Sequence, residues 1–353
     1  WHIYSRFVQK QQADCRFLKK FWYFCRMKEE VSIRLISHES DLPDIASHNF
    51  FHSVDFFRIL EATPMQEPCM AIAEDGTGHV VAHMLTTIFF HRSLLPPVVY
   101  LHGRVYGEGE YNEGIDKNLI FGRFLNAVTA RFNNRLCLYI EFSHLSNKMF
   151  GYEAFRANGY FPISWQEIHN SLHSLPPADR LSKKARHRIN RAQQSGSTAC
   201  VAQASSDELA DAARLLRRHF RFKPRRTVPK IEELRMLVKS GHSKVFVTKQ
   251  GTKVVATCVC IYSEGNAYIW YLAYNNKRRM ALSPMSHTVW TVLNNAHKTG
   301  YRHLYFLDAG LPFEHSSMRE FILSFGGKPV TKYRWFRTPF AWLNRLFSWI
   351  YSE

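Results

Sequence analysis

The stretch between residues 275 and 283 combines consecutive cations with a strong helix start, which suits the binding of phosphate groups. Ser283 is a favoured helix N-cap and Pro284 a favoured first helical residue, so we expect a helix from residue 284. The free N–H groups of that helix end attract a pyrophosphate or an RNA phosphate. The alternative is a capped helix behind a solvated basic loop. The residues of this candidate phosphate site are Lys277, Arg278, Arg279, Met280, Ala281 and Ser283.

A second candidate site lies at the end of the strand expected over residues 303–308. Asp308 ends this strand, and Glu314 and His315 follow a few residues later. A carboxylate or an imidazole at a strand end can take a proton from an attacking nucleophile, which is the chemistry of a general base. We therefore interpret these three residues as catalytic candidates. In the alternative interpretation, Asp308 only caps the turn that follows its strand.

Aromatic residues alternate along the strand that precedes the candidate phosphate loop. Trp270, Tyr271 and Tyr274 lie in this strand, which we expect over residues 265–274. One face of the strand could line a substrate pocket. Packing in the core is the competing use of such large side chains.

A dense basic tract runs from Arg214 to Arg226, with Arg217 and Arg218 at its centre and phenylalanines between its cations. Interleaved cations and aromatic rings can bind nucleic acid. They can equally bind an anionic headgroup or a nucleotide-linked acceptor, so we interpret Arg217 and Arg218 as substrate-binding candidates. The alternative is a solvated helix face.

The C-terminal segment, residues 334–353, is rich in tryptophan, phenylalanine and arginine, and Pro339 could begin a helix there. An aromatic, cationic helix that is too short to span a bilayer fits the surface of a membrane. The alternative is a final helix that packs on the core of the protein.

The composition favours a globular protein of two domains with an anionic partner. The chain has 353 residues, of which 46% are hydrophobic, and a formal net charge of +18. Such a charge indicates RNA, a phosphate-rich cofactor or an acidic membrane surface. The seven cysteines include no Cys-x-x-Cys pair, and the histidines show no zinc spacing, so we expect a reduced, cytoplasmic protein without a metal. Peripheral contact with the inner face of the membrane is compatible with this composition.

Similar segments occur twice along the chain in the same order. The hairpin-like stretches Met70–Ala82 and Val245–Ala256 each contain a Gly-Thr turn followed by Val-Val-Ala. Further on, Arg135–Ser143 and Arg302–Gly310 are strand-like runs at an offset of 167, and a Gly-x-x-Pro pattern follows each at the same offset. We interpret this order as a duplicated unit.

The hydrophobic periodicity predicts strands and helices that alternate along both halves, which is typical of a mixed α/β sheet. The expected strands cover residues 33–36, 70–74, 80–90, 98–106, 136–142, 244–249, 253–262, 265–274 and 303–308. The expected helices cover residues 116–132, 149–158, 178–195, 206–219, 230–240, 284–299 and 315–325.

This order of elements resembles the GNAT acyltransferase fold, and two such units joined by a basic helix resemble the FemABX-type transferases. The likeness covers roughly residues 45–336. It rests on Phe50–Phe57, on the basic stretch Lys184–Ala192, on Ser283-Pro284 and on Phe321–Gly327. The phosphate loop departs from the GNAT pattern because residues 276–282 contain no glycine.

The resemblance implies an N-acyltransferase that uses acyl-CoA as co-substrate and no metal. The second unit would hold the donor, and a small-molecule or lipid-linked amine would attack its carbonyl, with Asp308, Glu314 or His315 as proton acceptor. Two alternatives remain. One is an aminoacyl-tRNA-dependent transferase acting on a cell-wall precursor, and the other is a non-catalytic module that binds RNA or a membrane.

The resemblance also divides the chain into five parts. Because Trp1 is not a translation start and Met27 is the first methionine, we expect residues 1–26 to be a non-native or disordered extension. The other parts are a first GNAT-like domain (27–172), a basic helical linker (173–200), a second GNAT-like domain (201–333) and the C-terminal segment (334–353).

Overall fold

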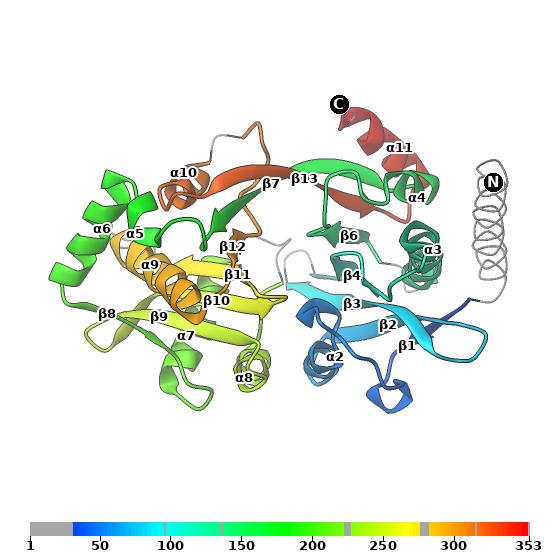
Figure 1. Ribbon diagram of the computed structural model, residues 1–353, viewed down its shortest axis with the longest axis horizontal. Coiled ribbons are helices and arrows are strands. Elements are labelled where there is room, and N and C mark those ends of the chain that lie inside the picture. The colour runs from blue at the N-terminus through cyan, green and yellow to red at the C-terminus, as the bar shows by residue number, and fades with distance from the viewer. Residues whose placement is uncertain are drawn as a thin grey trace, which may run out of the picture.

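The protein consists of two α/β units that share one 13-stranded sheet (Figure 1). The mixed α/β class with tandem GNAT-like units, predicted from the sequence, is confirmed. The expected extension over residues 1–26 lies outside the described residues. The computed structural model describes residues 31–94, 97–134, 137–221, 227–275, 282–314 and 316–351.

The first unit contains two hairpin-linked strand pairs and a long helix that packs on them. In chain order, its elements are β1 (Ser32–Ile36), η1 (Glu39–Asp41), η2 (Phe50–His52), α2 (Val54–Glu61), β2 (Gln66–Glu74), β3 (Val80–Leu94), β4 (Pro97–Tyr106), β5 (Glu110–Tyr111), α3 (Lys117–Asn134), β6 (Tyr139–Ser143), α4 (Tyr152–Ala157) and β7 (Phe161–Ser171).

The second unit repeats this plan after a helical connection. Its elements are α5 (Pro177–Arg180), α6 (Lys183–Gln194), β8 (Ser197–Val201), α7 (Asp207–His219), α8 (Ile231–Lys239), β9 (Ser243–Gln250), β10 (Lys253–Ser263), β11 (Asn266–Tyr274), α9 (Leu282–Thr299), β12 (His303–Phe306), α10 (Ser317–Leu323), β13 (Lys328–Arg337) and α11 (Ala341–Ile350).

The duplication is visible in the order of elements. The series β2, β3, β4, α3, β6, α4 and β7 matches the series β9, β10, β11, α9, β12, α10 and β13. Gly159 and Gly326, 167 residues apart, end the matching short helices α4 and α10 with positive φ angles of 74° and 89°. Only glycine adopts this conformation without strain, which explains why the sequence repeats it.

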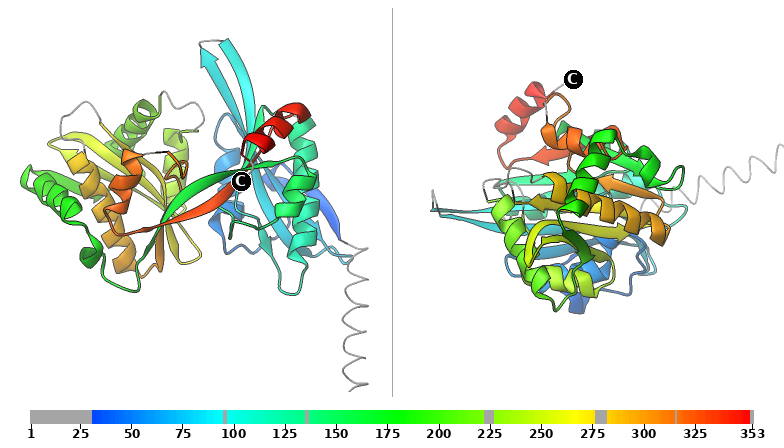
Figure 2. Two further views of the ribbon diagram at one scale, coloured as in Figure 1. Left: turned by 90° about the horizontal axis from the view of Figure 1, so that it is seen from above. Right: turned by 90° about the vertical axis from the view of Figure 1, so that its left-hand side faces the viewer.

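The two units exchange their last strands. The sheet order is β1-β2-β3-β4-β6-β13-β7-β12-β11-β10-β9-β8, so β13 pairs with β6 of the first unit and β7 pairs with β12 of the second. Between them, β7 and β13 form an antiparallel pair that bridges the molecule (Figures 1 and 2). Each unit therefore completes its sheet with a strand from the other half of the chain.

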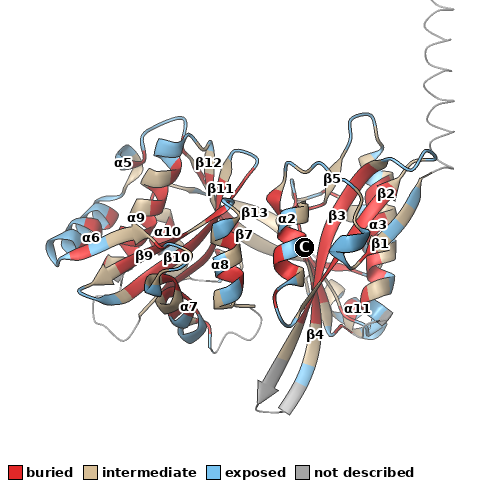
Figure 3. Cartoon of the chain, turned by 90° about the horizontal axis from the view of Figure 1, so that it is seen from below, coloured by how far each residue is buried: buried red, intermediate tan, exposed pale blue. Residues whose placement is uncertain are grey.

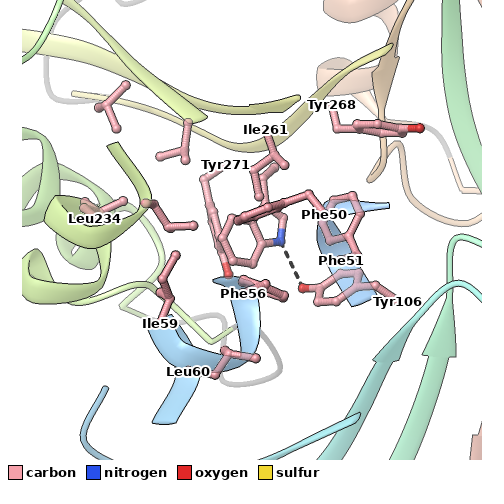
Figure 4. Close-up of a cluster of buried hydrophobic side chains, with 14 of the residues drawn as sticks. Phe50, Phe51, Phe56, Ile59, Leu60, Tyr106, Leu234, Ile261, Tyr268 and Tyr271 are labelled. Carbon is pink, nitrogen blue, oxygen red and sulfur yellow. Dashed lines mark hydrogen bonds between the residues drawn. The ribbon is translucent and has the colours of Figure 1, made fainter. Parts of the chain in front are cut away.

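One of the buried clusters joins the units. Phe51 and Phe56 of the first unit pack with Trp270 and Ile261 of the second, and Tyr106 closes the cluster (Figure 4). Each of the other two clusters lies mainly in one unit and includes residues from the other unit's part of the chain, Trp335 of β13 in one case and Ile168 of β7 in the other. In Figure 3 the buried residues run along the sheet under the helices. The phenylalanines of Phe50–Phe57, the stretch that resembles the family, thus belong to the core between the two units.

Several element boundaries differ from the sequence expectation. The basic helix expected over 178–195 is two helices, because Ser182 leaves helical geometry and its Oγ accepts a hydrogen bond from the Ala185 N–H to cap α6. Helix α9 begins at Leu282, so Ser283 lies in its first turn rather than before it. Strands β7, β8 and β13 were not expected at all.

Candidate active site

Strand β11 carries an extra residue near its centre. Val259 of β10 lies opposite Tyr271, but the next residue, Cys260, lies opposite Ile269, so Trp270 is bulged out of the register. A bulge bends its strand and increases its local twist. The end of β11 therefore turns away from its original direction after Ile269.

The parallel pairing between β11 and β12 stops at the same point. Its last pair is Ile269 with Phe306, whereas β11 continues along β10 to Tyr274. The chain beyond β12 is hydrogen-bonded to β7 instead. The Ala309 N–H donates to the Gln166 carbonyl, and the Gln166 N–H donates to the Gly310 carbonyl, both at 2.9 Å. The two strands thus diverge at their carboxyl ends, where an extended ligand can align with β11.

The matching strands of the first unit stay together. β4 and β6 pair in parallel through Tyr106 and Ser143, and the Gly107 N–H extends the pairing to the Ser143 carbonyl at 2.7 Å. Strands β3 and β4 pair without a register shift. Within the described residues, the divergence therefore belongs to the second unit.

Trp270 and Tyr271 are buried at this divergence. The Trp270 Nε1–H donates to the Tyr106 hydroxyl at 2.9 Å, which links the bulge to the end of β4 (Figure 4). The Tyr271 hydroxyl donates to the Thr227 carbonyl. Tyr274 is half-buried, and its carbonyl lies 3.2 Å from the His219 Nδ1 at the end of α7. Arg217 and Arg218 are exposed in the last turn of α7, so both lie near the end of β11.

The structure places two of the three catalytic candidates from the sequence, Asp308 and Glu314. The Asp308 carboxylate accepts a hydrogen bond from the Trp165 Nε1–H at 3.1 Å, two residues beyond β12. Glu314 lies in an exposed turn. His315 and the loop residues Lys277, Arg278, Arg279, Met280 and Ala281 fall outside the described residues. Ser283 is buried in the first turn of α9.

A buried carboxylate that the sequence did not single out lies on β7. The Glu167 Oε2 is 3.0 Å from the His169 Nε2, and its Oε1 is 3.4 Å from the His144 Nδ1. The Lys332 Nζ is 3.7 Å away. Burial alone would raise the pKa of Glu167, but the hydrogen bonds with the two histidines lower it well below its usual range. Glu167 is therefore ionised at neutral pH and can orient both imidazoles.

This His-Glu-His cluster borders the point of divergence. The Tyr268 and Tyr305 rings, which flank the last pairs of β11 and β12, stack at 5.2 Å. The His144 ring contacts Tyr268 at 5.0 Å, and the His169 ring contacts Tyr305 at 4.5 Å. His144 also has a positive φ of 61° directly after β6. Such strained backbone is concentrated at functional sites.

A signal for this cluster was present in the sequence. In β7, residues 165, 167 and 169 alternate with residues that face the opposite side of the sheet, so Trp165, Glu167 and His169 share one face. Recognising β7 as a strand would have brought them together. His144 follows β6 of the first unit, and it is the pairing of β7 with β12 that brings Glu167 and His169 beside the second unit.

A second charged group spans the junction of the units. Glu141 lies 3.5 Å from Arg104 Nη2 and 3.3 Å from Arg334 Nη1. The Arg334 Nη2–H donates to the Leu307 carbonyl at 2.7 Å, and the guanidinium lies over the Trp165 ring. Arg334 thereby fixes the segment that leaves β12. No group of His, Cys, Asp and Glu suited to a metal ion occurs in the described parts of the chain.

A family model matches the part of the chain that contains the diverging strands. Residues 180–315 match the family model described as an acetyltransferase (GNAT) domain. No curated protein matches the chain.

Solved structures resemble most of the chain in fold. FemX is 11% identical with a TM-score of 0.57, covering 91% of this chain and 100% of its own. A tandem GNAT protein from the clavulanic acid biosynthesis pathway is 13% identical with a TM-score of 0.57, covering 88% and 99%. The C-terminal domain of a putative lysylphosphatidylglycerol synthetase from Agrobacterium fabrum is 14% identical with a TM-score of 0.55, covering 85% and 92%.

The fold and the site define a tandem GNAT-like protein whose second unit has the diverging strands. Residues 180–315 are thus a GNAT acetyltransferase domain by their family match, and the chain has the fold of FemX and of tandem GNAT proteins. The resemblance stated from the sequence is confirmed.

Proposed function

We propose that this protein is an N-acyltransferase whose second unit holds an activated acyl donor along β11. Acyl-CoA is the favoured donor, and a small-molecule or lipid-linked amine is the acceptor. The amine attacks the donor carbonyl directly, so the acyl group moves to nitrogen and the thiol leaves. Binding both reactants at one point supplies most of the rate enhancement, and no covalent enzyme intermediate is needed.

The divergence of β11 from β12 is the observation that carries this proposal. The bulge at Trp270 and the shift of residues 309–310 to β7 leave the end of β11 beside a strand that has moved away. The exposed Arg217 and Arg218 near Tyr274 suit the phosphates of the donor. The proposed loop of Lys277, Arg278 and Arg279 follows β11 in the sequence.

Two proton acceptors flank the point of divergence. His144, oriented by the ionised Glu167, is the candidate that the structure adds, since a carboxylate at Nδ1 holds the imidazole for proton transfer at Nε2. Asp308 is the candidate from the sequence. We favour His144 because its ring contacts Tyr268, one residue before the last paired position, whereas the Asp308 carboxylate is hydrogen-bonded to Trp165.

Basic surfaces favour a second candidate donor, an aminoacyl-tRNA. Helix α6 exposes Lys183, Lys184, Arg186 and Arg191, and the chain carries a net charge of +18. Such a field binds the phosphates of RNA at low salt. An aminoacyl ester would then occupy the place of the thioester, with the same attack by an amine.

Incubation of the purified chain with each donor separates these possibilities. With acetyl-CoA and a panel of amines, a thiol-reactive dye should report free CoA only when an acceptor is present. With aminoacyl-tRNA, deacylation above the spontaneous rate would instead identify the ester donor. Lack of transfer from both donors, with an acceptor panel that includes aminolipids, would contradict the proposal.

A further inference from the structure

The C-terminal helix α11 is docked with a polar residue inward. Asn344 is 7% exposed, and its Oδ1 accepts hydrogen bonds from the Thr338 N–H and hydroxyl, both at 2.8 Å. Its Nδ2–H donates to the Thr338 carbonyl at 2.8 Å. On the same side, the Phe347 ring packs on Phe161 of β7 at 5.2 Å. These contacts fix the orientation of the helix on the protein.

The opposite side of α11 is apolar and faces outward. Trp342 is 66% exposed, Leu346 is 43% exposed and Trp349 is 75% exposed. Their spacing of three to four residues places them on one stripe of the helix. A helix at the surface of a globular protein normally buries its apolar stripe, and this one exposes it. Figures 1 and 2 show α11 on the outside of the molecule, next to α4.

The charged side chains of the segment that carries this stripe have a single sign. Residues 328–351 contain no aspartate or glutamate, and Arg345 is exposed between Trp342 and Trp349. A neighbouring cation, Arg156 of α4, donates a hydrogen bond to the Ser348 hydroxyl. Tryptophan and arginine on one exposed helix face match the headgroup region of a bilayer, where indole rings and cations are both stabilised.

We propose that α11 anchors the protein to the surface of an anionic phospholipid bilayer. The helix lies in the plane of the interface with Trp342, Leu346 and Trp349 among the headgroups and upper acyl chains, while Arg345 contacts lipid phosphate. No helix in the described part of the chain is long and apolar enough to cross a membrane, so this contact is peripheral. The inference is independent of the acyl donor and of the catalytic base.

Flotation of the full chain with vesicles tests this anchor. Vesicles of phosphatidylcholine with about one third phosphatidylglycerol should carry the protein upward, and pure phosphatidylcholine should carry much less. The double substitution Trp342→Ser and Trp349→Ser should reduce the bound fraction about tenfold or more, because both rings leave the interface. Arg345→Gln should weaken binding about fivefold on the anionic vesicles only, as expected for one cation near a charged surface.

A control variant distinguishes binding through α11 from non-specific hydrophobic binding to vesicles. Leu175→Ser removes an apolar side chain of similar exposure elsewhere (55%) and should leave flotation unchanged. Circular dichroism should show that the variants remain folded, because the changed side chains face outward. Equal flotation of the double variant and the unchanged protein would overturn the proposal. So would failure of the unchanged protein to bind anionic vesicles, or a dimer in solution that the double substitution dissolves.

Discussion

The two units of this protein contain the same series of elements but differ where two parallel strands meet. In the first unit, β4 and β6 remain paired to their ends, whereas in the second unit β11 and β12 separate after Ile269 and Phe306. One bulged residue, Trp270, accompanies this difference. The duplicated unit thus keeps its two parallel strands paired in the first copy and separates them in the second.

The same contrast applies to a pair of carboxylates at the repeat offset of 167. Glu141 of the first unit is fixed between Arg104 and Arg334 within the paired strands. Its counterpart Asp308 lies beyond the last pair of β12 and accepts a hydrogen bond from Trp165. The first carboxylate is therefore interpreted as structural, and the second stays the alternative proton acceptor to His144.

The largest expected effect is on catalysis. His144→Asn removes the proposed base and retains a residue that tolerates positive φ, so the fold should persist. We expect kcat to fall by about 100-fold or more, within the range that general bases supply. Asp308→Asn should impair turnover less, and steady-state rates with the identified donor measure both. Full activity in both variants would refute the assignment of the base to this site.

The second prediction compares how much Glu141 and Asp308 contribute to the free energy of unfolding. Glu141→Gln leaves the buried Arg334 and the half-buried Arg104 without their shared counter-ion, which should cost about 3–5 kcal/mol of the free energy of unfolding. Asp308→Asn should cost less than about 1 kcal/mol, since the indole keeps a hydrogen-bond acceptor. Urea unfolding of both variants makes the comparison. Equal losses would show that the two carboxylates have the same structural role.

A pH dependence follows from a third buried carboxylate, at a contact between the units. Burial raises the pKa of Glu233 to about 7, although the Gln66 Nε2–H of the first unit donates to it at 2.9 Å. The folded state therefore favours protonated Glu233. The stability that this gives is fully present below pH 4.5 and is lost as the pH rises through about 7. Glu233→Gln should remove that slope and add at most about 3 kcal/mol above pH 7. Unfolding curves between pH 5 and 8 test this, and an unchanged slope in the variant would contradict it.

The smallest effect concerns the hydrogen bond that Trp270 of the second unit donates to Tyr106 of the first. Tyr106→Phe leaves the buried Trp270 N–H without its acceptor, at a cost of about 1–3 kcal/mol. Tyr152→Phe in α4 serves as the control, because it removes a tyrosine hydroxyl while the ring keeps its packing on Trp335. Thermal unfolding compares the two. Similar melting temperatures for both variants would show that this bond does not couple the units.

The sequence predicted the duplicated α/β plan because the hairpins, long helices and turn glycines are local features. It did not predict β7 and β13, in which polar and apolar residues alternate less clearly. Their exchange is a long-range choice of partner that local periodicity does not encode. The contacts of His144 and His169 with Tyr268 and Tyr305 depend on the pairing of β7 with β12, whereas Asp308 could be proposed from the sequence because it follows a clear strand.

Hydrogen–deuterium exchange with bound donor tests the central claim most directly. Coenzyme A and a non-hydrolysable aminoacyl-tRNA analogue should be compared in separate experiments. Because β11 and β12 separate, we expect one of these ligands to protect the backbone amides of residues 270–274 from exchange. Exchange of residues 102–106 in the first unit should stay unchanged. Protection along β4 and β6 instead, or no protection of β11 by either ligand, would contradict a donor site in the second unit.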